Sequence, residues 1–371
     1  MAKYYFIAGE ASGDLHAAAV IHEIRKRDTK AEIRAWGGDQ MKRAGAHIDK
    51  HISKLAFMGF LEVLANLPAI VRNFSLCKKN IIDFQPDAIV LVDYAGFNLR
   101  MARFAKKHEI RVYYYIAPKV WAWRKSRIRQ LKAYVDRLFV IFPFEKSFFA
   151  KHNMQVEYVG NPLVERISKF EKEDDFLAKH HLPDDFVALL PGSRQQELKK
   201  IFPVMLSVAK QMPHRFFVVA ALQKSKSFFD SIHLPDNVKL LYDTTYGVLS
   251  YAHSAVVTSG TATLETAMFD VPQVVVYKGG AISFWIANKV VDRTFLKHIS
   301  LVNIIAQKEV VKELIQNDFT IGNTIKELRN IFAGKRKRTQ ILADYSYLVD
   351  LLGNEKSSAR IVEAILKDFA P

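Results

Sequence analysis

Short apolar runs that end in glycine-containing turns recur along this chain, and they constrain its fold most strongly. Residues 3–8 form one such run, followed by the turn Gly-Glu-Ala-Ser-Gly-Asp at 9–14 and by a helix expected from Leu15 to about Arg27. The continuous apolar run that ends at Val92 is typical of a central strand in a parallel sheet. Strand, glycine turn and helix together open a Rossmann-like half, although no G-x-G-x-x-G dinucleotide fingerprint is present.

The pattern restarts after a charge-rich stretch at 166–185, which contains Pro183 and is predicted to be a linker. Phe186–Leu190 is then a strand that runs into a Pro-Gly-Ser-Arg turn, and further strands are expected at 216–220, 238–241, 255–258 and 274–277. We therefore predict an α/β protein with two Rossmann-like domains facing a cleft, at 1–165 and 186–350. A helix is expected from Glu309, and a last helix within 351–371 can pack back on the first domain.

Length and cysteine content narrow the class further. A chain of 371 residues exceeds what one hydrophobic core usually organises. Its single cysteine, Cys77, excludes an internal disulfide and a multi-thiolate metal site, and it fits a reducing compartment. The sequence moves directly into a strand without a signal peptide, and no apolar run approaches the roughly 18 residues of a membrane-spanning helix. We expect a cytoplasmic protein.

The charge balance predicts an anionic partner. Lys and Arg number 54 against 38 Asp and Glu, which gives a net charge of +16. Nucleic acid, an anionic membrane surface and a phosphorylated substrate all fit such a charge. No RNA-binding signature, zinc-finger spacing or helix-turn-helix is evident, so nucleic acid is not expected.

The stretch from Val256 to Glu265 is predicted to bind a nucleotide diphosphate. It combines a buried strand, the turn Ser259-Gly260-Thr261 and the first turn of a helix, whose free N–H groups favour anions. Glu265 follows about one helical turn beyond Thr261, where its carboxylate could accept two ribose hydroxyls. The alternative is a plain strand-to-helix connection with a Ser or Thr cap.

Two further residues suit a sugar transfer, which needs a base for the acceptor and stabilisation of the leaving diphosphate. Asp93 follows a central strand at its carboxyl end, where open α/β sheets bind ligands; alternatively it is a turn or capping aspartate. Arg194 stands at a predicted helix start, where it can meet a diphosphate. No Asp-x-Asp occurs to hold a metal, so neutralisation would rest on Arg194 and helix dipoles.

Two segments suggest a lipid-bearing or interfacial ligand. Residues 55–84 are rich in apolar side chains and are interrupted by Pro68, which fits either two kinked core helices or a lip that meets a membrane or acyl chains. Residues 119–137 combine two tryptophans with many basic residues, which suits a phosphate-bearing ligand; a solvated basic helix is the alternative.

The ordered strings GEASGD, YIAPKVWAWR, FPFEKSFF, LPGSRQQE, TSGTATLE and SLVNIIA closely resemble the lipid-A-disaccharide synthase family of Gram-negative bacteria. The resemblance implies a GT-B enzyme with two Rossmann-like domains, no metal or other cofactor, and inversion at the anomeric centre. It implies transfer from UDP-2,3-diacylglucosamine to 2,3-diacylglucosamine 1-phosphate, giving the lipid A disaccharide 1-phosphate and UDP. It also implies a peripheral position on the inner membrane, with anionic phospholipid as a partner. The oligomeric state stays open, a dimer included.

The resemblance assigns roles residue by residue. Asp93 matches the proposed base for the acceptor 6-hydroxyl, and Asn303 matches a site asparagine. The donor diphosphate and nucleotide positions are Arg194, Glu197, Ser259, Gly260, Thr261 and Glu265. The acceptor or membrane side comprises Gly9, Ser12, Gly13, Trp123, Arg124, Phe57, Phe60 and Leu61, where the last three become membrane- or acyl-facing candidates.

Two positions differ from the family pattern. Members often carry a second acid where this chain has Gly96, which rules out a carboxylate dyad there, and a histidine where it has Asn161. Three other functions stay open from the residues: a UDP-sugar epimerase, a transferase acting on another lipid-linked sugar, and a non-catalytic basic membrane adaptor. An epimerase would act without an acceptor, and an adaptor would not bind UDP.

Overall fold

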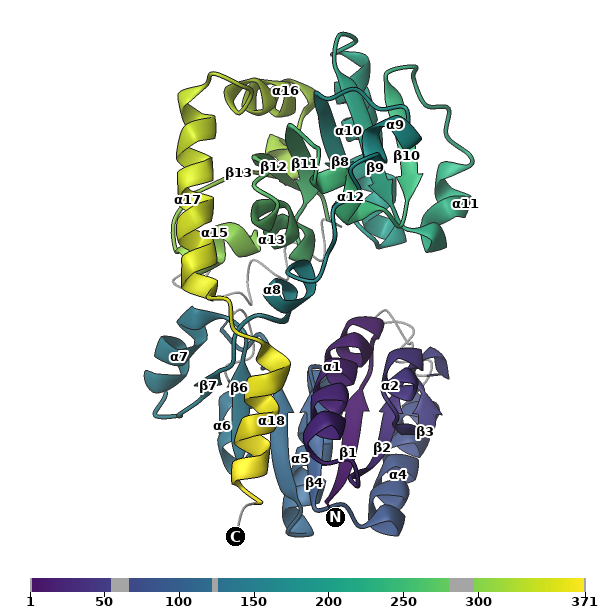
Figure 1. The fold of residues 1–371 in the computed structure, drawn as a ribbon, viewed down its shortest axis with the longest axis vertical. Coiled ribbons are helices and arrows are strands. Elements are labelled where there is room, and N and C mark those ends of the chain that lie inside the picture. Colours follow the sequence, from purple (N-terminus) through teal and green to yellow (C-terminus); the bar gives the residue numbers. More distant parts are fainter. Residues whose placement is uncertain (1, 55–66, 122–125, 280–296, 370–371) are drawn as a thin grey trace. The chain divides into compact units, whose positions relative to one another are not determined.

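The computed structural model describes residues 2–54, 67–121, 126–279 and 297–369. The chain divides into two compact units, which are coloured along the sequence in Figure 1. The first unit comprises Met1–Glu165 together with Asn354–Pro371, and the second comprises Arg166–Gly353. Among the described residues, no helix is long and apolar enough to cross a membrane.

The first unit is built on a seven-stranded sheet in the order β3-β2-β1-β4-β5-β6-β7. All neighbouring strands are parallel. Because β1 lies between β2 and β4, the chain reverses its direction of sheet growth there, and ligands of open α/β sheets bind at the carboxyl ends beside such a point. The strands are β1 (Lys3–Ala8), β2 (Glu32–Gly37), β3 (His47–His51), β4 (Ala88–Val92), β5 (Arg111–Tyr115), β6 (Arg137–Val140) and β7 (Glu157–Tyr158).

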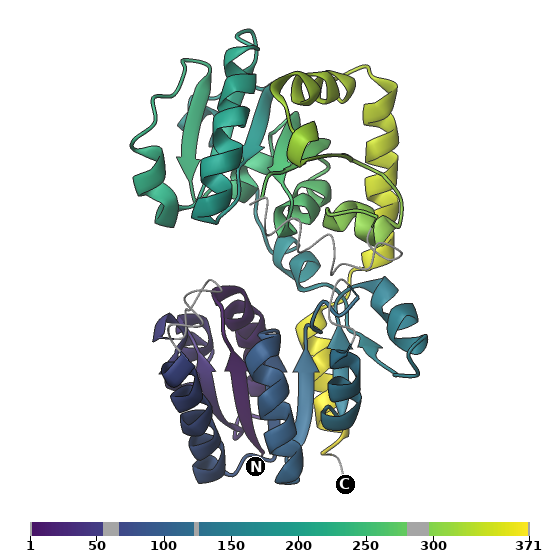
Figure 2. The same cartoon turned by 180° about the vertical axis from the view of Figure 1, so that it is seen from behind.

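Helices cover both faces of this sheet. One face is packed by α1 and α18, and the other by α4, α5 and α6, as Figures 1 and 2 show from opposite sides. The helices of the unit are α1 (Ala11–Arg27), α2 (Asp39–Arg43), η1 (Ile52–Lys54), α4 (Leu67–Phe84), α5 (Ala95–Lys107), α6 (Arg127–Tyr134), α7 (Pro143–Ala150) and α18 (Ser357–Lys367). Helix α8 (Pro162–Ile167) spans the sequence boundary between the units.

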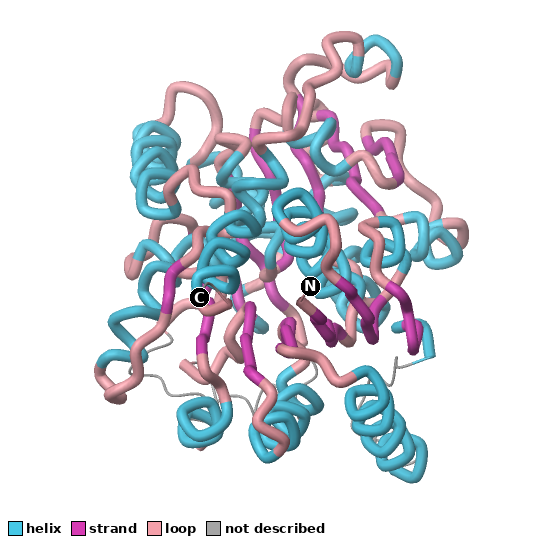
Figure 3. The backbone as a smooth tube through the Cα atoms, turned by 60° about the horizontal axis from the view of Figure 1, so that its bottom comes forward, coloured by secondary structure: helices cyan, strands magenta, loops and turns pink. Residues whose placement is uncertain are grey.

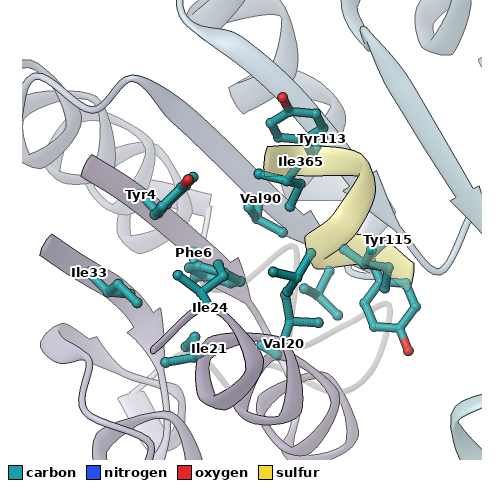
Figure 4. Close-up of a cluster of buried hydrophobic side chains, with 14 of the residues drawn as sticks. Tyr4, Phe6, Val20, Ile21, Ile24, Ile33, Val90, Tyr113, Tyr115 and Ile365 are labelled. Atoms are coloured by element: carbon teal, nitrogen blue, oxygen red, sulfur yellow. The ribbon is translucent and has the colours of Figure 1, made fainter. Parts of the chain in front are cut away.

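The core on the α1 side shows why the last helix belongs to this unit. Alternate residues of the central strands, such as Tyr4, Phe6 and Val90, point toward α1 and α18 (Figure 4). Ile361 and Ile365 of α18 are fully buried among them. The segment after the helix is also tied to β5, since the Tyr113 hydroxyl donates to the Asp368 carboxylate at 2.9 Å.

The second unit repeats the architecture with a six-stranded parallel sheet in the order β10-β9-β8-β11-β12-β13. Its strands are β8 (Phe186–Leu190), β9 (Phe216–Ala221), β10 (Val238–Tyr242), β11 (Ser254–Thr258), β12 (Gln273–Tyr277) and β13 (Lys312–Ile315). Its helices are α9 (Phe176–Lys179), α10 (Gln195–Lys210), η2 (Gln223–Ser225), α11 (Lys226–Phe229), α12 (Thr245–Leu249), α13 (Thr261–Met268), α15 (Leu301–Ala306), η3 (Gln316–Asp318), α16 (Ile321–Asn330) and α17 (Arg336–Leu352). Figure 3 follows the alternation of strands and helices along the backbone.

The structure differs from the sequence expectations at three places. Residues 166–185 are part of the second unit rather than a bare linker, because Phe176 is buried in its core and stacks on Tyr251 at 5.8 Å. The helix expected from Glu309 is wrong: Lys312–Ile315 forms the edge strand β13, paired with β12. Helix α1 begins at Ala11, four residues before its expected start at Leu15. The expected kink at Pro68, the second residue of α4, stays a prediction, because residues 55–66 lie outside the described residues.

Candidate active site

Glycines and a buried carboxylate shape the turn that follows β1. A Cβ at Gly9 would lie 2.4 Å from ring carbons of Tyr94, and one at Gly13 would lie 3.1 Å from the Ala8 Cβ. Asp14 is buried and accepts hydrogen bonds from the backbone N–H groups of Gly38, Gln40 and Met41, at 2.7, 3.0 and 3.2 Å. The first turn of α1 is thereby pinned to the start of α2, and Ser12 in this turn stays exposed.

Asp93 is held in an uncommon backbone conformation at the carboxyl end of β4. Asp93 and Tyr94 both have left-handed φ values, of 46° and 47°. The Asp93 carbonyl accepts from Asn98 Nδ2 at 2.8 Å and from the Tyr114 hydroxyl at 2.6 Å. Such strained residues persist where the surroundings over-determine them, and they cluster at functional sites. The Asp93 side chain is exposed, so it is available to a ligand.

The surroundings raise the pKa of the Asp93 carboxyl. The largest cause is desolvation, because the surrounding protein removes water from the carboxyl even though the residue stays partly open to solvent. The negative charge of the neighbouring Glu10 raises the pKa further. Lys119, from the loop after β5, acts in the opposite direction and lowers the pKa. A carboxyl with a raised pKa is a better proton acceptor, which suits a general base.

Glu145 is a buried acid that the sequence analysis quoted within FPFEKSFF but gave no role. One carboxylate oxygen accepts from Trp121 Nε1 at 3.0 Å, and the other accepts from the backbone N–H groups of Ile141 and Phe142 at 3.2 and 3.0 Å. Burial raises the pKa of Glu145 to about 7, despite these hydrogen bonds and Lys119, which lower it. A glutamate two residues after a helix-starting proline was the available signal, since it is typical of a capping box.

The two positions that differ from the family pattern also differ structurally. Gly96 is exposed in the first turn of α5, and a Cβ there would meet nothing within 4 Å. Asn161 is buried, with its Nδ2 donating to the Ile141 carbonyl at 3.2 Å and its Oδ1 accepting from the Leu163 N–H at 2.9 Å. Asn161 thus caps α8, and it does not substitute for an acid–base group.

In the second unit, the predicted donor residues gather at the carboxyl ends of β8 and β11, which are adjacent strands. The Arg194 guanidinium pairs with the Glu197 carboxylate at 3.1 Å, and 77% of the Arg194 side chain is exposed. A Cβ at Gly192, which has a φ of +96°, would lie 3.2 Å from Glu197 and 3.4 Å from Thr258. Gly192 therefore permits the close approach of the Arg194 loop to the end of β11.

The Ser259-Gly260-Thr261 turn connects β11 to α13. Ser259 donates through its hydroxyl to the Ile299 carbonyl at 2.9 Å, and its N–H donates to the Val276 carbonyl at 3.0 Å. Gly260 is the N-cap of α13, and its carbonyl accepts from the Thr263 hydroxyl at 2.8 Å. The first N–H groups of a helix have no acceptor within it, so the exposed end at Thr261 offers donors to an anion.

Glu265 lies one turn further along α13 and is half-buried. One of its oxygens accepts from the Tyr246 hydroxyl at 3.0 Å, and the Arg166 guanidinium lies over the Tyr246 ring at 5.0 Å. Burial raises the pKa of Glu265, whereas the Tyr246 hydrogen bond and Arg166 lower it. The Tyr246 hydrogen bond fixes the orientation of the carboxylate, and the second carboxylate oxygen suits a pair of hydroxyl donors.

Asn303 does not have the geometry of a ligand-contacting residue. Its side chain is fully buried, Nδ2 donates to the Val311 carbonyl and to Glu313, and Oδ1 accepts from the N–H groups of Val310 and Val311. An amide has two N–H donors and two lone pairs, and all four are used here. Its predicted place among the donor-binding residues is therefore corrected to a supporting one.

The structure brings the predicted site residues together as two sets. Gly9, Ser12, Gly13 and Asp93 share the carboxyl edge of the first sheet. The set at the carboxyl edge of the second sheet comprises Arg194, Glu197, Ser259, Gly260, Thr261 and Glu265. Phe57, Phe60, Leu61, Trp123 and Arg124 lie outside the described residues.

Comparison with solved structures identifies the fold. The crystal structure of UDP-GlcNAc 2-epimerase from Neisseria meningitidis bound to UDP-GlcNAc aligns with a TM-score of 0.67 at 16% identity, over 98% of this chain and 100% of that one. The structure of the glycotransferase of kitacinnamycin aligns with a TM-score of 0.69 at 13% identity, over 99% and 98%. At these identities the likeness shows fold alone, and it confirms the predicted GT-B-like class with two Rossmann-like halves.

Comparison of sequences identifies the family. The model of the lipid-A-disaccharide synthetase family matches residues 4–366. The lipid-A-disaccharide synthase of Syntrophus aciditrophicus (strain SB) is 37% identical over 357 residues, which cover 94% of this chain and 92% of that protein. The resemblance predicted from the six sequence strings is confirmed, and this chain belongs to the lipid-A-disaccharide synthase family.

Proposed function

We propose that this protein transfers the sugar of UDP-2,3-diacylglucosamine to 2,3-diacylglucosamine 1-phosphate, releasing UDP and forming the lipid A disaccharide 1-phosphate. Family membership supports a glycosyltransferase of this class. Within the structure, the proposal rests on one observation. The Ser259-Gly260-Thr261 turn opens a helix that places Glu265 one turn further on, and the loop that carries the exposed Arg194 approaches the residue before this turn, Thr258, at Gly192.

The second unit would bind the donor. Arg194 and the amino end of α13 would stabilise the diphosphate, because a guanidinium and free helix N–H groups both favour phosphate oxygens. Glu265 would accept the ribose hydroxyls through the oxygen that Tyr246 leaves unused. Glu197 would orient Arg194 through their 3.1 Å ion pair.

The first unit would activate the acceptor. Asp93 would take the proton of the acceptor 6-hydroxyl, and the resulting oxygen would attack the anomeric carbon of the donor sugar. The bond between that carbon and the diphosphate oxygen breaks, and its electron pair leaves with UDP. Attack from the side opposite to the leaving group inverts the anomeric centre. Arg194 and α13 offset the charge that develops on the diphosphate.

We also propose that the α4–α5–α6 face of the first unit meets anionic phospholipid on the inner face of the inner membrane. Asp83 is the sole acid in the sequences of these three helices. Their exposed cations are Arg72, Lys78, Lys79, Arg100, Arg103, Lys106, Lys107, Arg129 and Lys132. Each basic residue near an anionic surface contributes about 1 kcal/mol of attraction.

Vesicle sedimentation tests this second proposal. The double variant Arg103→Glu, Lys107→Glu should bind vesicles containing phosphatidylglycerol more weakly than wild type. The control double variant Lys326→Glu, Lys337→Glu changes the net charge equally but lies on the second unit, and it should lose less binding. Equal losses from the two double variants would show that net charge, and not this face, determines binding. Retained binding in both would refute a role for these cations.

The transfer itself is tested by UDP release from UDP-2,3-diacylglucosamine, with and without acceptor, in detergent and EDTA. Wild type should release UDP only with the acceptor, EDTA should have no effect, and Asp93→Asn should lose most of the turnover while still binding UDP. Conversion of the UDP-sugar without acceptor would instead indicate a 2-epimerase, the function of a fold relative. Full activity of Asp93→Asn would remove Asp93 from the chemistry.

A further inference from the structure

Glu313 is a buried carboxylate on the edge strand β13, and its side chain is 6% exposed. It accepts from the backbone N–H of Ile299 at 3.0 and 3.1 Å, and from that of Ser300 at 2.8 Å. It also accepts from the Ser300 hydroxyl at 2.7 Å and from Asn303 Nδ2 at 2.9 Å. Four donors from one short segment thus converge on a single carboxylate.

The segment that Glu313 holds contacts the nucleotide-binding turn directly. The Ile299 carbonyl accepts from the Ser259 hydroxyl at 2.9 Å. Two residues later, the Leu301 N–H donates to the Thr263 hydroxyl oxygen at 3.2 Å, and that hydroxyl donates to the Gly260 carbonyl at 2.8 Å. Hydrogen bonds therefore hold Ile299 and Ser300 to Glu313, and the same short segment is bonded to Ser259 and, through Thr263, to Gly260 of the turn.

The segment depends on these side-chain hydrogen bonds for its conformation. Residues 297–300 belong to neither a helix nor a strand, so no backbone ladder fixes them. Hydrogen bonds to an ionised acceptor are shorter and stronger than neutral ones, and an unpaired buried donor is costly. Asn303 reinforces the same arrangement, because it joins Glu313 to the residues that precede β13.

We propose that Glu313 is a positioning residue for diphosphate binding: through Ile299 and Ser300 it fixes the Ser259-Gly260-Thr261 turn in the conformation that receives the phosphates. The proposal deepens the proposed function and rests on it, since it takes that turn as the diphosphate site. Glu313 itself does not touch the nucleotide. Its effect should therefore be transmitted through the Ser259–Ile299 hydrogen bond.

Calorimetric titration with UDP, in the absence of acceptor, tests this route. Glu313→Gln keeps the side-chain size but replaces one acceptor oxygen with an amide N–H, and Ser259→Ala removes the hydroxyl that binds Ile299. Each single variant should bind UDP about tenfold more weakly than wild type. The double variant should have the same UDP affinity as the single variant with the lower affinity, because both changes break the same pathway. Asp344→Asn is the matched control: it alters a buried acid of the same unit that pairs with Lys308 at 2.7 Å, and it should leave UDP affinity unchanged.

Three results would overturn the proposal or its basis. If Glu313→Gln lowers the melting temperature as Asp344→Asn does, without weakening UDP binding, Glu313 is only structural. If the effects of Glu313→Gln and Ser259→Ala multiply in the double variant, they act by separate routes. If Ser259→Ala and Arg194→Ala both bind UDP normally, the nucleotide site and the proposed function fail together. Should Glu313→Gln not fold, Ser300→Ala replaces it, since it removes one donor to Glu313 and keeps the charge.

Discussion

Burying Glu145 makes the stability of the first unit depend on pH. The pKa of its carboxyl rises from 4.5 to about 7 in the folded protein. A folded-state pKa above the unfolded value means that the folded state holds the proton more tightly. The stabilisation from this proton is fully present below pH 4.5 and is lost as the pH rises through 7.

The two pKa values set the size of the effect. Proton linkage reduces the free energy of unfolding by about 2 kcal/mol between pH 4 and pH 6, and by roughly 3 kcal/mol by pH 8. Glu145→Gln removes the titrating group. At pH 5 the folded wild type holds Glu145 protonated, and the hydroxyl oxygen of this acid can still accept a hydrogen bond. The amide nitrogen of glutamine cannot accept, so one of the donors Trp121, Ile141 and Phe142 loses a partner and the variant should be less stable at pH 5. That deficit should shrink or reverse by pH 8.

Urea unfolding of wild type and Glu145→Gln at several pH values between 5 and 8 measures this difference. Trp121→Phe should change the pH dependence of stability in the opposite direction to Glu145→Gln. It keeps the carboxyl but removes a hydrogen bond that lowers the pKa of Glu145, so this pKa should rise further. It should steepen the loss of stability toward pH 8. Parallel stability curves for wild type and Glu145→Gln would refute the reasoning, since the carboxyl would then titrate equally in the folded and unfolded states.

Three further predictions concern the first unit. Lys119→Met should move the acidic limb of the pH profile of kcat/KM to higher pH, because the charge of Lys119 lowers the pKa of Asp93. An unchanged acidic limb would show that Lys119 does not influence the catalytic base. Ile365→Ala should lower the free energy of unfolding by about 2–5 kcal/mol, since the side chain is fully buried between α1 and the sheet; a urea-derived loss below about 1 kcal/mol would contradict its role in holding α18. Gly9→Ala should impair folding or turnover because its Cβ would overlap the Tyr94 ring, whereas Gly96→Ala should be tolerated; equal melting temperatures and turnover for the two would disprove the steric argument.

The sequence predicts the strands well where burial is complete. Lys3–Ala8 and Phe186–Leu190 are continuous apolar runs, and the structure has strands β1 and β8 over the same residues. The edge strand β13 was predicted as helix because Lys312 and Glu313 interrupt its apolar pattern. Edge strands are half-exposed, so their composition resembles that of an exposed helix, and only pairing with β12 distinguishes them.

The candidate site was predictable to a lesser degree, because residue type does not reveal which acid faces a ligand. Asp93 and Glu265 stand at strand or helix ends that the sequence pattern exposes, and the structure leaves them exposed and half-buried. Glu145 and Glu313 have the same chemistry, yet burial commits them to backbone N–H groups of loops. For Glu145 the spacing signals only a helix cap, and its bond to Trp121 is not evident from the sequence. The backbone partners of Glu313 lie on a separate segment, so neither spacing nor composition could identify them.

This contrast suggests a division of work among the acids of the two sheets. Asp14, Glu145 and Glu313 each accept several hydrogen bonds from a loop near the carboxyl edge of a sheet, and each is almost fully enclosed. A buried carboxylate with several donors costs much to displace, so it fixes a loop more firmly than an apolar contact does. The side chains proposed to meet substrate, such as Arg194, remain free to do so because the loops that carry them are held by other residues. Replacing a holding acid should therefore weaken ligand binding through loop geometry, whereas replacing Asp93 should lower turnover with little change in UDP affinity.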